Sequence, residues 1–444
     1  MAMNDPNLDP AQMPPSLWTA TAAPAPATQA LAEGEHSAEL LVVGGGFSGL
    51  TAALAGAQRG ADVMLLEAAE IGWGASGRNN GQVIPTLTRA DPDILVREFG
   101  AEHGEALVGL LRDSANAVFE RIREFNIECE AVQNGWVQPA HRTSRLALSR
   151  SRHDQWKKRG APVQMLNREQ VAAITGSNFW HGGWQNRSDG HINPLGFARG
   201  LAGAALARGV RVHTRSPVMG LERRGEDWLA RVGKSTTIKA RRVILATQGY
   251  TGLSTASPWP GLAQCFVPMR AYQMATQPLP DKLRASILPG NHALSDTQAD
   301  LHFARLDARG RLVSGGALIF AANWDARLRA RIGQRLLKLY PQLLELGGGV
   351  RFEHLWHGTF AATPDQLPRF HRLADGLYTW LGCNGRGVAF ATALGPVLAD
   401  AALGPNGKHI ALPFEAPRRI FAHALVKRMA IGAMALFRWR DGRD

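Results

Sequence analysis

Three glycines near the N-terminus have a spacing that can hold a pyrophosphate. Gly44, Gly46 and Gly49 follow the order G-x-G-x-x-G. The first glycine permits a tight turn, the second lets the backbone approach the phosphates, and the third lets a helix pack closely on a strand. The N–H groups and the positive dipole at the start of that helix attract the phosphates. We therefore predict that these glycines bind a dinucleotide, together with Phe47 and Ser48.

The residues around the glycines predict the strand, helix and acid that such a site requires. An apolar run at residues 40–43 is too short for a helix and fits a buried strand. A helical pattern follows over residues 50–57, and a second apolar run over residues 63–66 ends on Glu67. Its carboxylate can accept hydrogen bonds from a ribose diol, and its charge disfavours a 2′-phosphate. A glycine triplet alone can be an ordinary turn, so the complete β-α-β unit is what predicts dinucleotide binding.

A loop rich in Gly, Ser and Asn follows this unit, at residues 68–82. Such a composition excludes regular helix or strand. Its position after the second strand places it near the carboxyl edge of the sheet, where ligands bind. We therefore favour a ligand-binding loop over a plain surface loop. Its predicted contacts with the cofactor are Ala68, Ala75, Ser76, Arg78, Asn79, Asn80, Gly81 and Gln82.

The composition limits the class of protein. The chain has 444 residues, of which 45% are hydrophobic and 20% are charged, and this fits a soluble globular protein of about two or three domains. The net charge of +13 permits attraction to anionic partners, but the basic residues are scattered and the sequence carries no nucleic-acid-binding motif. We therefore predict a basic, solvated surface and no nucleic-acid partner.

The cysteines and the N-terminal residues indicate the cellular compartment in which the protein is expected. Cys129, Cys265 and Cys383 lack the C-x-x-C spacing of a metal site. We predict no metal, no disulfide framework and a reducing, cytoplasmic compartment. Residues 1–37 lack the apolar core of a secretory signal and are predicted to form an irregular arm, anchored by Leu17 and Trp18. No uncharged apolar run reaches about 18 residues, so we expect no integral membrane segment.

Hydrophobic periodicity divides the rest of the chain into helices and strands. Helical patterns cover residues 91–126, 142–159, 171–174, 194–209, 326–346 and 388–401, and Pro341 is expected to break or kink the fifth. Strand patterns cover residues 136–139, 180–197, 210–213, 218–221, 228–232, 242–246, 265–279 and 377–381. A hairpin over residues 300–318 turns at residues 307–310. A glycine turn at residues 382–387 precedes the last helix, whose positive end can stabilise negative charge on a ligand, although a simple connection has the same pattern.

These motifs give the chain a resemblance to a known family. The segments that carry it include VVGGGFSGL, IGWGASGRNNGQV, VILATQGY, WHGTFAATPDQLP and GCNGRGVAFATALGPVLAD. In order and spacing they resemble those of the flavin-dependent amine and amino-acid oxidases, which include D-amino acid oxidase, glycine oxidase and monomeric sarcosine oxidase. The resemblance covers nearly the whole chain, and glutamylputrescine oxidases are the most similar members.

The resemblance implies an α/β fold with two domains that are discontinuous in sequence. A Rossmann-like FAD-binding domain would comprise residues 38–100, 190–255 and 355–412. A mixed-sheet substrate domain of α+β type would comprise residues 101–189 and 256–354. Residues 413–444 would form a C-terminal helix.

The resemblance also implies how FAD is bound. The pyrophosphate would lie over the glycines, the ribose on Glu67 and the adenine side near Val218. Further implied contacts are Ala246, Thr247, Gly249, Trp356, Gly358, Gly385, Arg386, Gly387 and Val388. Sarcosine oxidases attach their flavin through a cysteine, and the corresponding segment of this chain has none. We therefore expect noncovalent FAD.

The chemistry that the resemblance implies is oxidation of a C–N bond by hydride transfer to flavin N5. The product would be an imine, which water hydrolyses to a carbonyl compound and an amine. The implied substrate is an amine or amino acid: a glutamylputrescine-like compound, an N-substituted glycine or a D-amino acid. O2 is the expected acceptor, with H2O2 as product, and the flavin carries the difficult step.

Five side chains are candidates for contact with the substrate: Arg270, Tyr272, Trp356, His357 and Arg386. Arginine can grip a carboxylate with two parallel hydrogen bonds. Aromatic faces can guide a cationic amine, and histidine can serve as a base near neutral pH. Plainer interpretations stay open: a solvated strand residue for Arg270, core packing for Trp356 and a packed neutral ring for His357.

Departures from the family pattern leave the substrate and some alternatives open. Asn80 stands where relatives often carry Gly, and Arg386 stands where they often carry His, so the substrate can differ from glutamylputrescine.

Three other functions stay open. A dehydrogenase would pass electrons to a quinone or protein, and its basic segment at residues 418–438 could touch anionic lipid. An aromatic hydroxylase would need a G-D flavin motif, which the sequence lacks. A non-enzymatic nucleotide or nucleic-acid binder is suggested only by the charge.

Overall fold

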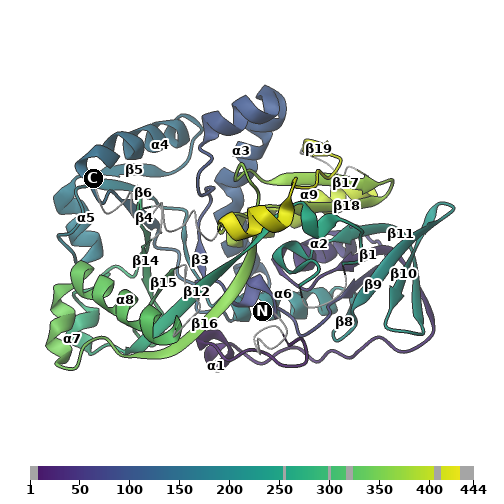
Figure 1. Cartoon of the computed structure of the whole chain (residues 1–444), viewed down its shortest axis with the longest axis horizontal. Helices are drawn as coiled ribbons and strands as arrows, with labels where there is room; N and C mark the ends of the chain where they lie inside the picture. The colour runs from purple at the N-terminus through teal and green to yellow at the C-terminus, as the bar shows by residue number, and fades with distance from the viewer. Residues whose placement is uncertain (1–8, 254–256, 299–301, 317–323, 405–411, 431–444) are drawn as a thin grey trace.

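The computed structural model describes residues 9–253, 257–298, 302–316, 324–404 and 412–430. These residues form two large mixed sheets with helices packed on them (Figure 1). A short ribbon pairs β3 (Gln82–Val83) with β7 (Gly190–His191). The arrangement confirms the predicted α/β architecture with a second, mixed sheet.

The first large sheet contains the predicted β-α-β unit. Its order is β19-β17-β18-β11-β1-β2-β8, and the β9–β10 hairpin pairs with β11. The five strands from β18 to β8 in this order run parallel. The bounds are β1 (Glu35–Val43), β2 (Val63–Leu66), β8 (Arg211–His213), β9 (Val218–Arg224), β10 (Asp227–Val232), β11 (Thr236–Leu245), β17 (Arg369–Ala374), β18 (Leu377–Leu381) and β19 (Phe414–Glu415).

Small residues let three helices approach this sheet and one another closely. The helices α2 (Phe47–Gln58), α6 (Pro194–Ala207) and α9 (Val388–Leu403) share one apolar core with Leu40 and Val42 of β1, whereas Leu41 and Val43 face a second core. Both faces of the sheet are covered, which explains why its strands are continuously apolar. At Gly395 of α9, a Cβ atom would lie 2.0 Å from the Thr51 hydroxyl oxygen of α2. The close contact between these helices therefore requires glycine.

The second large sheet has the order β16-β12-β15-β14-β13-β4-β6-β5. Its bounds are β4 (Trp136–Pro139), β5 (Val163–Leu166), β6 (Gly183–Asn186), β12 (Val267–Pro278), β13 (Ala293–Ser295), β14 (Phe303–Leu306), β15 (Arg311–Gly316) and β16 (Phe352–Ala362). The β14–β15 hairpin confirms the predicted turn at residues 307–310. Strand β16 crosses the predicted domain boundary at residue 354, and the division into domains stays a prediction.

Helix α8 (Trp324–Leu339) covers one face of the second sheet. Its buried side chains Leu328, Ile332 and Leu336 recur at helical spacing and pack in one core with Tyr272 of β12. The predicted break at Pro341 is confirmed, because α8 ends at Leu339 and a 3₁₀ turn, Pro341–Leu346, follows.

The other helices lie around the second sheet and at the join of the two sheets (Figure 1). They are α3 (Pro92–Glu124), α4 (Leu146–Lys158), α5 (Arg168–Thr175) and α7 (Asp281–Arg284). The predicted helix over residues 91–126 is confirmed with one interruption, since Gly100 has a φ of +80° inside α3. A positive φ of this size breaks the helical path and favours glycine.

The two ends of the chain differ in how they are held. The arm at the N-terminus forms the short helix α1 (Leu17–Thr21), in which Leu17 and Trp18 are completely buried. The predicted C-terminal helix over residues 413–444 begins later, at residue 423, after β19. Pro413 and Pro417 favour an extended backbone in the segment before it. Residues 431–444, and with them part of the basic segment at residues 418–438, lie outside the described residues.

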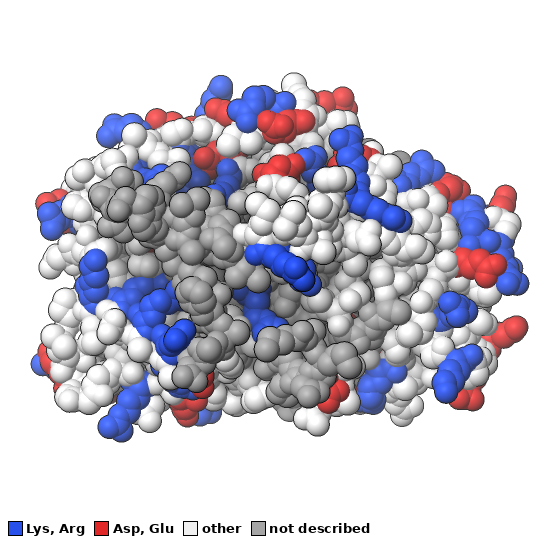
Figure 2. Space-filling model, in the orientation of Figure 1, with Lys and Arg blue, Asp and Glu red and all other residues white. Residues whose placement is uncertain are grey.

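The basic side chains are distributed over the surface. On the face drawn in Figure 2, Lys and Arg lie in several separate groups, many of them beside Asp or Glu. Within the described ranges, none of the helices combines the length and the apolar character needed to cross a bilayer.

Candidate active site

A cavity of about 1130 Å³ opens between the two large sheets. Val43, Leu66 and Ala246 line it at the carboxyl ends of β1, β2 and β11, and residues of β12 and β16 line it from the second sheet. Most small-molecule pockets have about 300–1000 Å³. The cavity can therefore hold an unusually large ligand, or a cofactor and a substrate together.

The three predicted glycines form one end of the cavity. Gly44 has a φ of +117°, and a Cβ atom there would lie 2.8 Å from the Ala246 carbonyl oxygen. At Gly46 a Cβ atom would lie 2.8 Å from Ser76 Oγ, and at Gly49 it would lie 1.9 Å from the Gly44 carbonyl oxygen. Gly44 and Gly46 line the cavity, whereas Gly49 packs behind it. The glycines thus keep the first turn of α2 open to a ligand and close to its own strand.

Glu67 lies at the end of β2 and lines the same part of the cavity. Its Oε2 accepts a hydrogen bond from the Gly45 N–H (2.7 Å), and its Oε1 accepts one from the Ala69 N–H (2.9 Å). Burial raises the pKa of the Glu67 carboxyl, and these hydrogen bonds oppose the shift. A carboxylate has about four acceptor positions. The carboxylate can therefore still accept from a hydroxyl group of a ligand.

The glycine-rich loop passes along the middle of the cavity. Ala75, Ser76, Arg78, Asn79, Asn80 and Gln82 line it. The Arg78 guanidinium lies 4.3 Å from the centroid of the Trp73 ring, and Arg78 Nε donates to the Trp73 carbonyl (2.6 Å). Gly81 has a φ of +76°, and a Cβ atom there would lie 2.1 Å from the Ile192 carbonyl oxygen, so the loop packs closely on residue 192 at this glycine. The loop is therefore held from behind as well as exposed to the cavity.

Strands β12 and β16 form the opposite wall, and their register decides which side chains reach it. The antiparallel pairing sets Ala271 opposite Gly358 and Gln273 opposite Trp356. Opposite residues share one face of a sheet, and the residues of these strands on the cavity side include Met269, Ala271, Gln273, Gly358, Phe360 and Ala362. Trp356 is on the same face but is buried behind the loop, where its Nε1 donates to the Arg78 carbonyl (2.9 Å).

Three predicted substrate contacts lie on the other face of this wall. Arg270 is exposed, whereas Tyr272 packs 5.3 Å from the Trp324 ring of α8 and 5.4 Å from the His357 ring. Neighbours along a strand point to opposite faces. The structure therefore does not bring Arg270, Tyr272 and His357 into the cavity that Ala271 and Gly358 line.

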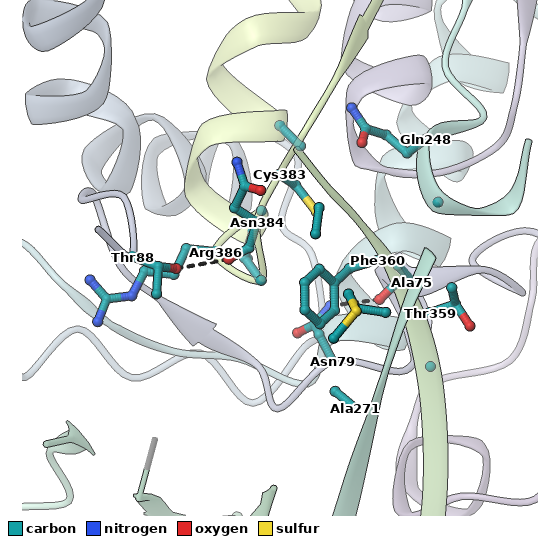
Figure 3. Close-up of a pocket in the computed structure, with 18 of the residues that line it drawn as sticks. Ala75, Asn79, Thr88, Gln248, Ala271, Thr359, Phe360, Cys383, Asn384 and Arg386 are labelled. Carbon is teal, nitrogen blue, oxygen red and sulfur yellow. Dashed lines mark hydrogen bonds between the residues drawn. The ribbon is translucent and has the colours of Figure 1, made fainter. Parts of the chain in front are cut away.

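Arg386 lines the cavity, but its guanidinium turns away from Phe360 (Figure 3). Its Nη1 donates to the Thr86 hydroxyl (2.5 Å) and the Leu87 carbonyl (3.2 Å), and the group lies 4.9 Å from the centroid of the Trp136 ring. Burial lowers the pKa of Arg386 to about 9. Among the described residues, no group accepts a hydrogen bond from its buried Nη2. Arg386 thus holds one buried donor that has no acceptor in the described part of the chain.

Most of the predicted cofactor contacts line the cavity together. The set comprises Gly44, Gly46, Phe47, Ser48, Glu67, Ala68, Ala75, Ser76, Arg78, Asn79, Asn80, Gln82, Val218, Ala246, Thr247, Gly249, Gly358, Gly385, Arg386, Gly387 and Val388. The exceptions are Gly49, Gly81 and Trp356, which support the wall from behind.

Other residues of the cavity were missed from the sequence. Tyr250 packs its ring 5.4 Å from Trp73, and its hydroxyl accepts from the Thr359 N–H (3.1 Å). It ends the segment VILATQGY, whose earlier residues were assigned. The ion pair between Arg152 and Asp91 (2.9 Å) also lines the cavity, and no local pattern links these two residues. In the described part of the chain, no cluster of His, Cys, Asp and Glu is placed to hold a metal ion.

Comparison with known proteins decides the family. The profile of the DAO family, described as FAD dependent oxidoreductase, matches residues 39–401. The chain belongs to the DAO family. Gamma-glutamylputrescine oxidoreductase of Escherichia coli K12 is 30% identical over 395 residues, which cover 85% of this chain and 90% of that protein.

Solved structures share the DAO fold. L-proline dehydrogenase from P. horikoshii has a TM-score of 0.69 at 19% identity, over 84% of this chain and 95% of its own. Glycine oxidase from Geobacillus kaustophilus has a TM-score of 0.69 at 18% identity, over 87% of this chain and 100% of its own. The predicted family, fold class and enzyme class, an FAD-dependent oxidoreductase, are confirmed.

The residues of this DAO-family enzyme fit FAD. Gly46, Phe47 and Ser48 line the cavity at the first turn of α2, where the helix N-terminus can hold phosphates. Glu67 keeps acceptor positions for a ribose, and the cavity continues from there to the loop at residues 75–82 and the β12–β16 wall. An extended dinucleotide can therefore run along the cavity.

Proposed function

We propose that this DAO-family enzyme oxidises a C–N bond of a small amine or amino acid, with FAD bound in the cavity. The observation that carries the proposal is the β12–β16 wall, which encloses a space lined by both apolar and polar side chains beside the predicted flavin loop. Such a space can hold a substrate against a cofactor and exclude water. The names of the relatives, which refer to gamma-glutamylputrescine, L-proline and glycine, support an amine or amino acid.

The residues of the chain would bind and orient the reactants. The first turn of α2 holds the phosphates, and Glu67 holds the ribose. Met269, Ala271 and Phe360 keep water from the reacting carbon. The Gln273 amide and Arg386 Nη2 can orient the polar ends of a substrate. Bound FAD would supply the acceptor for the electrons released when the C–N bond is oxidised.

An anaerobic panel of amines tests the proposal. It includes glutamylated diamines, N-methyl amino acids, glycine and both enantiomers of common amino acids, and it is scored by the loss of oxidised-flavin absorbance. We expect at least one member to bleach the flavin. A flavin that every member leaves oxidised, while dithionite still reduces it, would refute the proposed chemistry.

The electron acceptor separates the two enzyme classes that fit this site. We propose O2, which would yield H2O2, whereas a dehydrogenase would use a quinone or a protein. Admitting air to the substrate-reduced enzyme should restore the yellow colour of the flavin within the time of one catalytic turnover. It should yield one molecule of H2O2 for each molecule of substrate oxidised. Slow reoxidation by air together with fast reoxidation by a quinone would assign a dehydrogenase. The cytoplasmic location also stays a prediction.

The FAD is proposed to be noncovalent. Of the three cysteines, Cys383 alone lines the described cavity, and burial raises the pKa of its thiol. Because the thiolate is the attacking form of cysteine, its reaction with a flavin is disfavoured. Acid precipitation of the enzyme should leave the yellow colour in the supernatant. A yellow pellet that becomes white in Cys383→Ser would instead show attachment at this residue.

Replacement of Arg386 by Ala should weaken the binding of acidic substrates. Removing Nη2 takes away one buried charged donor, and such hydrogen bonds contribute about 1.5–3 kcal/mol. We expect the KM of a carboxylate-bearing substrate to rise about 10-fold or more, with a smaller change for a neutral amine. Arg311→Ala is the control, because it removes another buried arginine, which is ion-paired with Asp307 and does not line the cavity. An unchanged KM for the acidic substrate would reject this role for Arg386.

A further inference from the structure

We propose that Trp18 of the N-terminal arm is a positioning residue of the flavin site. It would act through the loop at residues 78–80, which it holds in place together with Trp356 and Arg305. This inference rests on the proposed placement of FAD along that loop. It assigns a function to an arm that lies outside the matched family profile, which begins at residue 39.

Three consecutive carbonyls of the loop each accept a hydrogen bond from a different part of the chain. The Arg78 carbonyl accepts from Trp356 Nε1 (2.9 Å) of β16. The Asn79 carbonyl accepts from Trp18 Nε1 (2.7 Å) of α1, which is 61 residues away in sequence. The Asn80 carbonyl accepts from Arg305 Nε (2.7 Å) of β14. No short segment of the chain could supply these three donors, so the loop is fixed only when all three elements have packed.

The three donors also fix one another. Trp18 and Trp356 are both buried and meet edge to face, with their ring centroids 5.6 Å apart. The Arg305 guanidinium lies 4.7 Å from the centroid of the Trp18 ring, and its Nη2 donates to the Ile192 carbonyl (2.9 Å). Aromatic pairs and cation–π contacts of this kind favour one arrangement over others. We call these three residues, Trp18, Trp356 and Arg305, the carbonyl clamp.

The clamp acts from behind the cavity wall. Asn79 and Asn80 line the cavity, whereas none of the three clamp residues does. In a trans peptide, the carbonyl of one residue and the N–H of the next point in opposite directions. Because Trp18 draws the Asn79 carbonyl backward, the N–H of Asn80 is directed to the cavity side. A donor held in this way can stabilise negative charge on a ligand without reorganising.

The arm itself is fixed at several points. Ser16 and Thr19 cap α1 reciprocally, with the Thr19 N–H donating to Ser16 Oγ (3.1 Å) and the Ser16 N–H donating to Thr19 Oγ1 (2.8 Å). Trp73, which stacks with Arg78 at the cavity, donates its Nε1 to the Gln12 carbonyl (2.9 Å). The arm is therefore hydrogen-bonded to both ends of the segment from Trp73 to Asn79.

The substitution Trp18→Phe tests the proposal. It removes the Nε1 donor and keeps an aromatic ring against Trp356 and Arg305. The matched control is Trp228→Phe. It removes the hydrogen bond that Nε1 of another buried tryptophan donates to the Asp375 carbonyl (3.1 Å), away from the cavity. A lost hydrogen bond of this type corresponds to about a 5-fold change in an equilibrium constant. We expect both variants to lose similar thermal stability. Only Trp18→Phe should bind FAD about 5-fold more weakly and shift the visible absorbance of the bound flavin.

Equal FAD affinity and equal flavin spectra in the two variants would overturn the proposal and leave Trp18 as a packing residue. If Trp18→Phe gives no soluble protein, hydrogen exchange of the wild-type enzyme tests whether the N-terminal arm is coupled to FAD binding. Addition of FAD to the apoprotein should then slow exchange at residues 16–22 and leave residues 227–232 unchanged, and no change at residues 16–22 would refute the coupling. A wild-type enzyme that binds FAD but is reduced by no amine would refute the proposed function and leave this comparison valid.

Discussion

Gly46→Val should give a folded protein that binds FAD at least about 100-fold more weakly than the wild type. A Cβ atom at residue 46 would lie 2.8 Å from Ser76 Oγ, and the two methyl groups of valine would occupy the space beside the first turn of α2. A valine side chain at the proposed phosphate position would push the pyrophosphate away from the helix N-terminus, and a 100-fold loss of affinity corresponds to about 2.7 kcal/mol of binding free energy. Gly46 has a φ of −91°, so valine can adopt its backbone conformation. The FAD dissociation constant and the flavin absorbance of the purified protein measure the effect.

The matched control for this variant is Gly203→Val. Gly203 lies in α6, and a Cβ atom there would meet no atom of the described residues within 4 Å. The same added side chain should therefore leave FAD affinity unchanged, and it should not weaken the helix, because valine has a higher helix propensity than glycine. Wild-type FAD affinity in Gly46→Val would show that the phosphates do not lie beside this glycine.

Glu67→Gln should weaken FAD binding about 10- to 100-fold. The carboxylate accepts hydrogen bonds from the Gly45 and Ala69 N–H groups and can still accept from the ribose. An amide has one oxygen and therefore cannot replace all of these acceptors, and hydrogen bonds to a charged group contribute about 1.5–3 kcal/mol each. Glu70→Gln is the control, since Glu70 is ion-paired with Arg215 and does not line the cavity. Equal FAD affinity in the two variants would contradict the ribose role of Glu67.

The pH dependence of FAD binding should identify the same carboxyl. Burial raises the pKa of Glu67, so protonation of its carboxylate occurs at a higher pH than for a free glutamate. The protonated form loses acceptor capacity, and wild-type FAD affinity should therefore fall as the pH falls through this raised pKa. Titration of FAD affinity in Glu67→Gln should lack that step.

Local patterns were sufficient to predict the nucleotide end of the site. The strand, glycine turn, helix and acid from Leu40 to Glu67 follow one another in sequence, and the structure reproduces them in that order. Their positions depend on backbone rules that act over a few residues, such as the turn at Gly44 and the close packing at Gly49. The break at Pro341 was predictable for the same reason.

The substrate end depended on contacts that no local pattern contains. In a strand, the side chains of residues 270 and 271 must point to opposite faces of the sheet, but the strand sequence does not determine which of them faces a cavity. The register of β12 with β16 and the packing of α8 decide that Ala271 faces the cavity and Tyr272 does not. In the same way, the direction of Arg386 is set by Thr86 and Trp136, residues far from it in sequence.

The most direct test of the proposed site is an experimental structure of the enzyme purified with its flavin. We predict density for FAD along the described cavity, with the pyrophosphate against the first turn of α2 and the ribose at Glu67. The ring system should lie between the loop at residues 78–82 and the β12–β16 wall at Ala271 and Phe360. A flavin ring on the Arg270 and His357 side of that wall, or a pyrophosphate away from Gly46, would contradict the site assigned here.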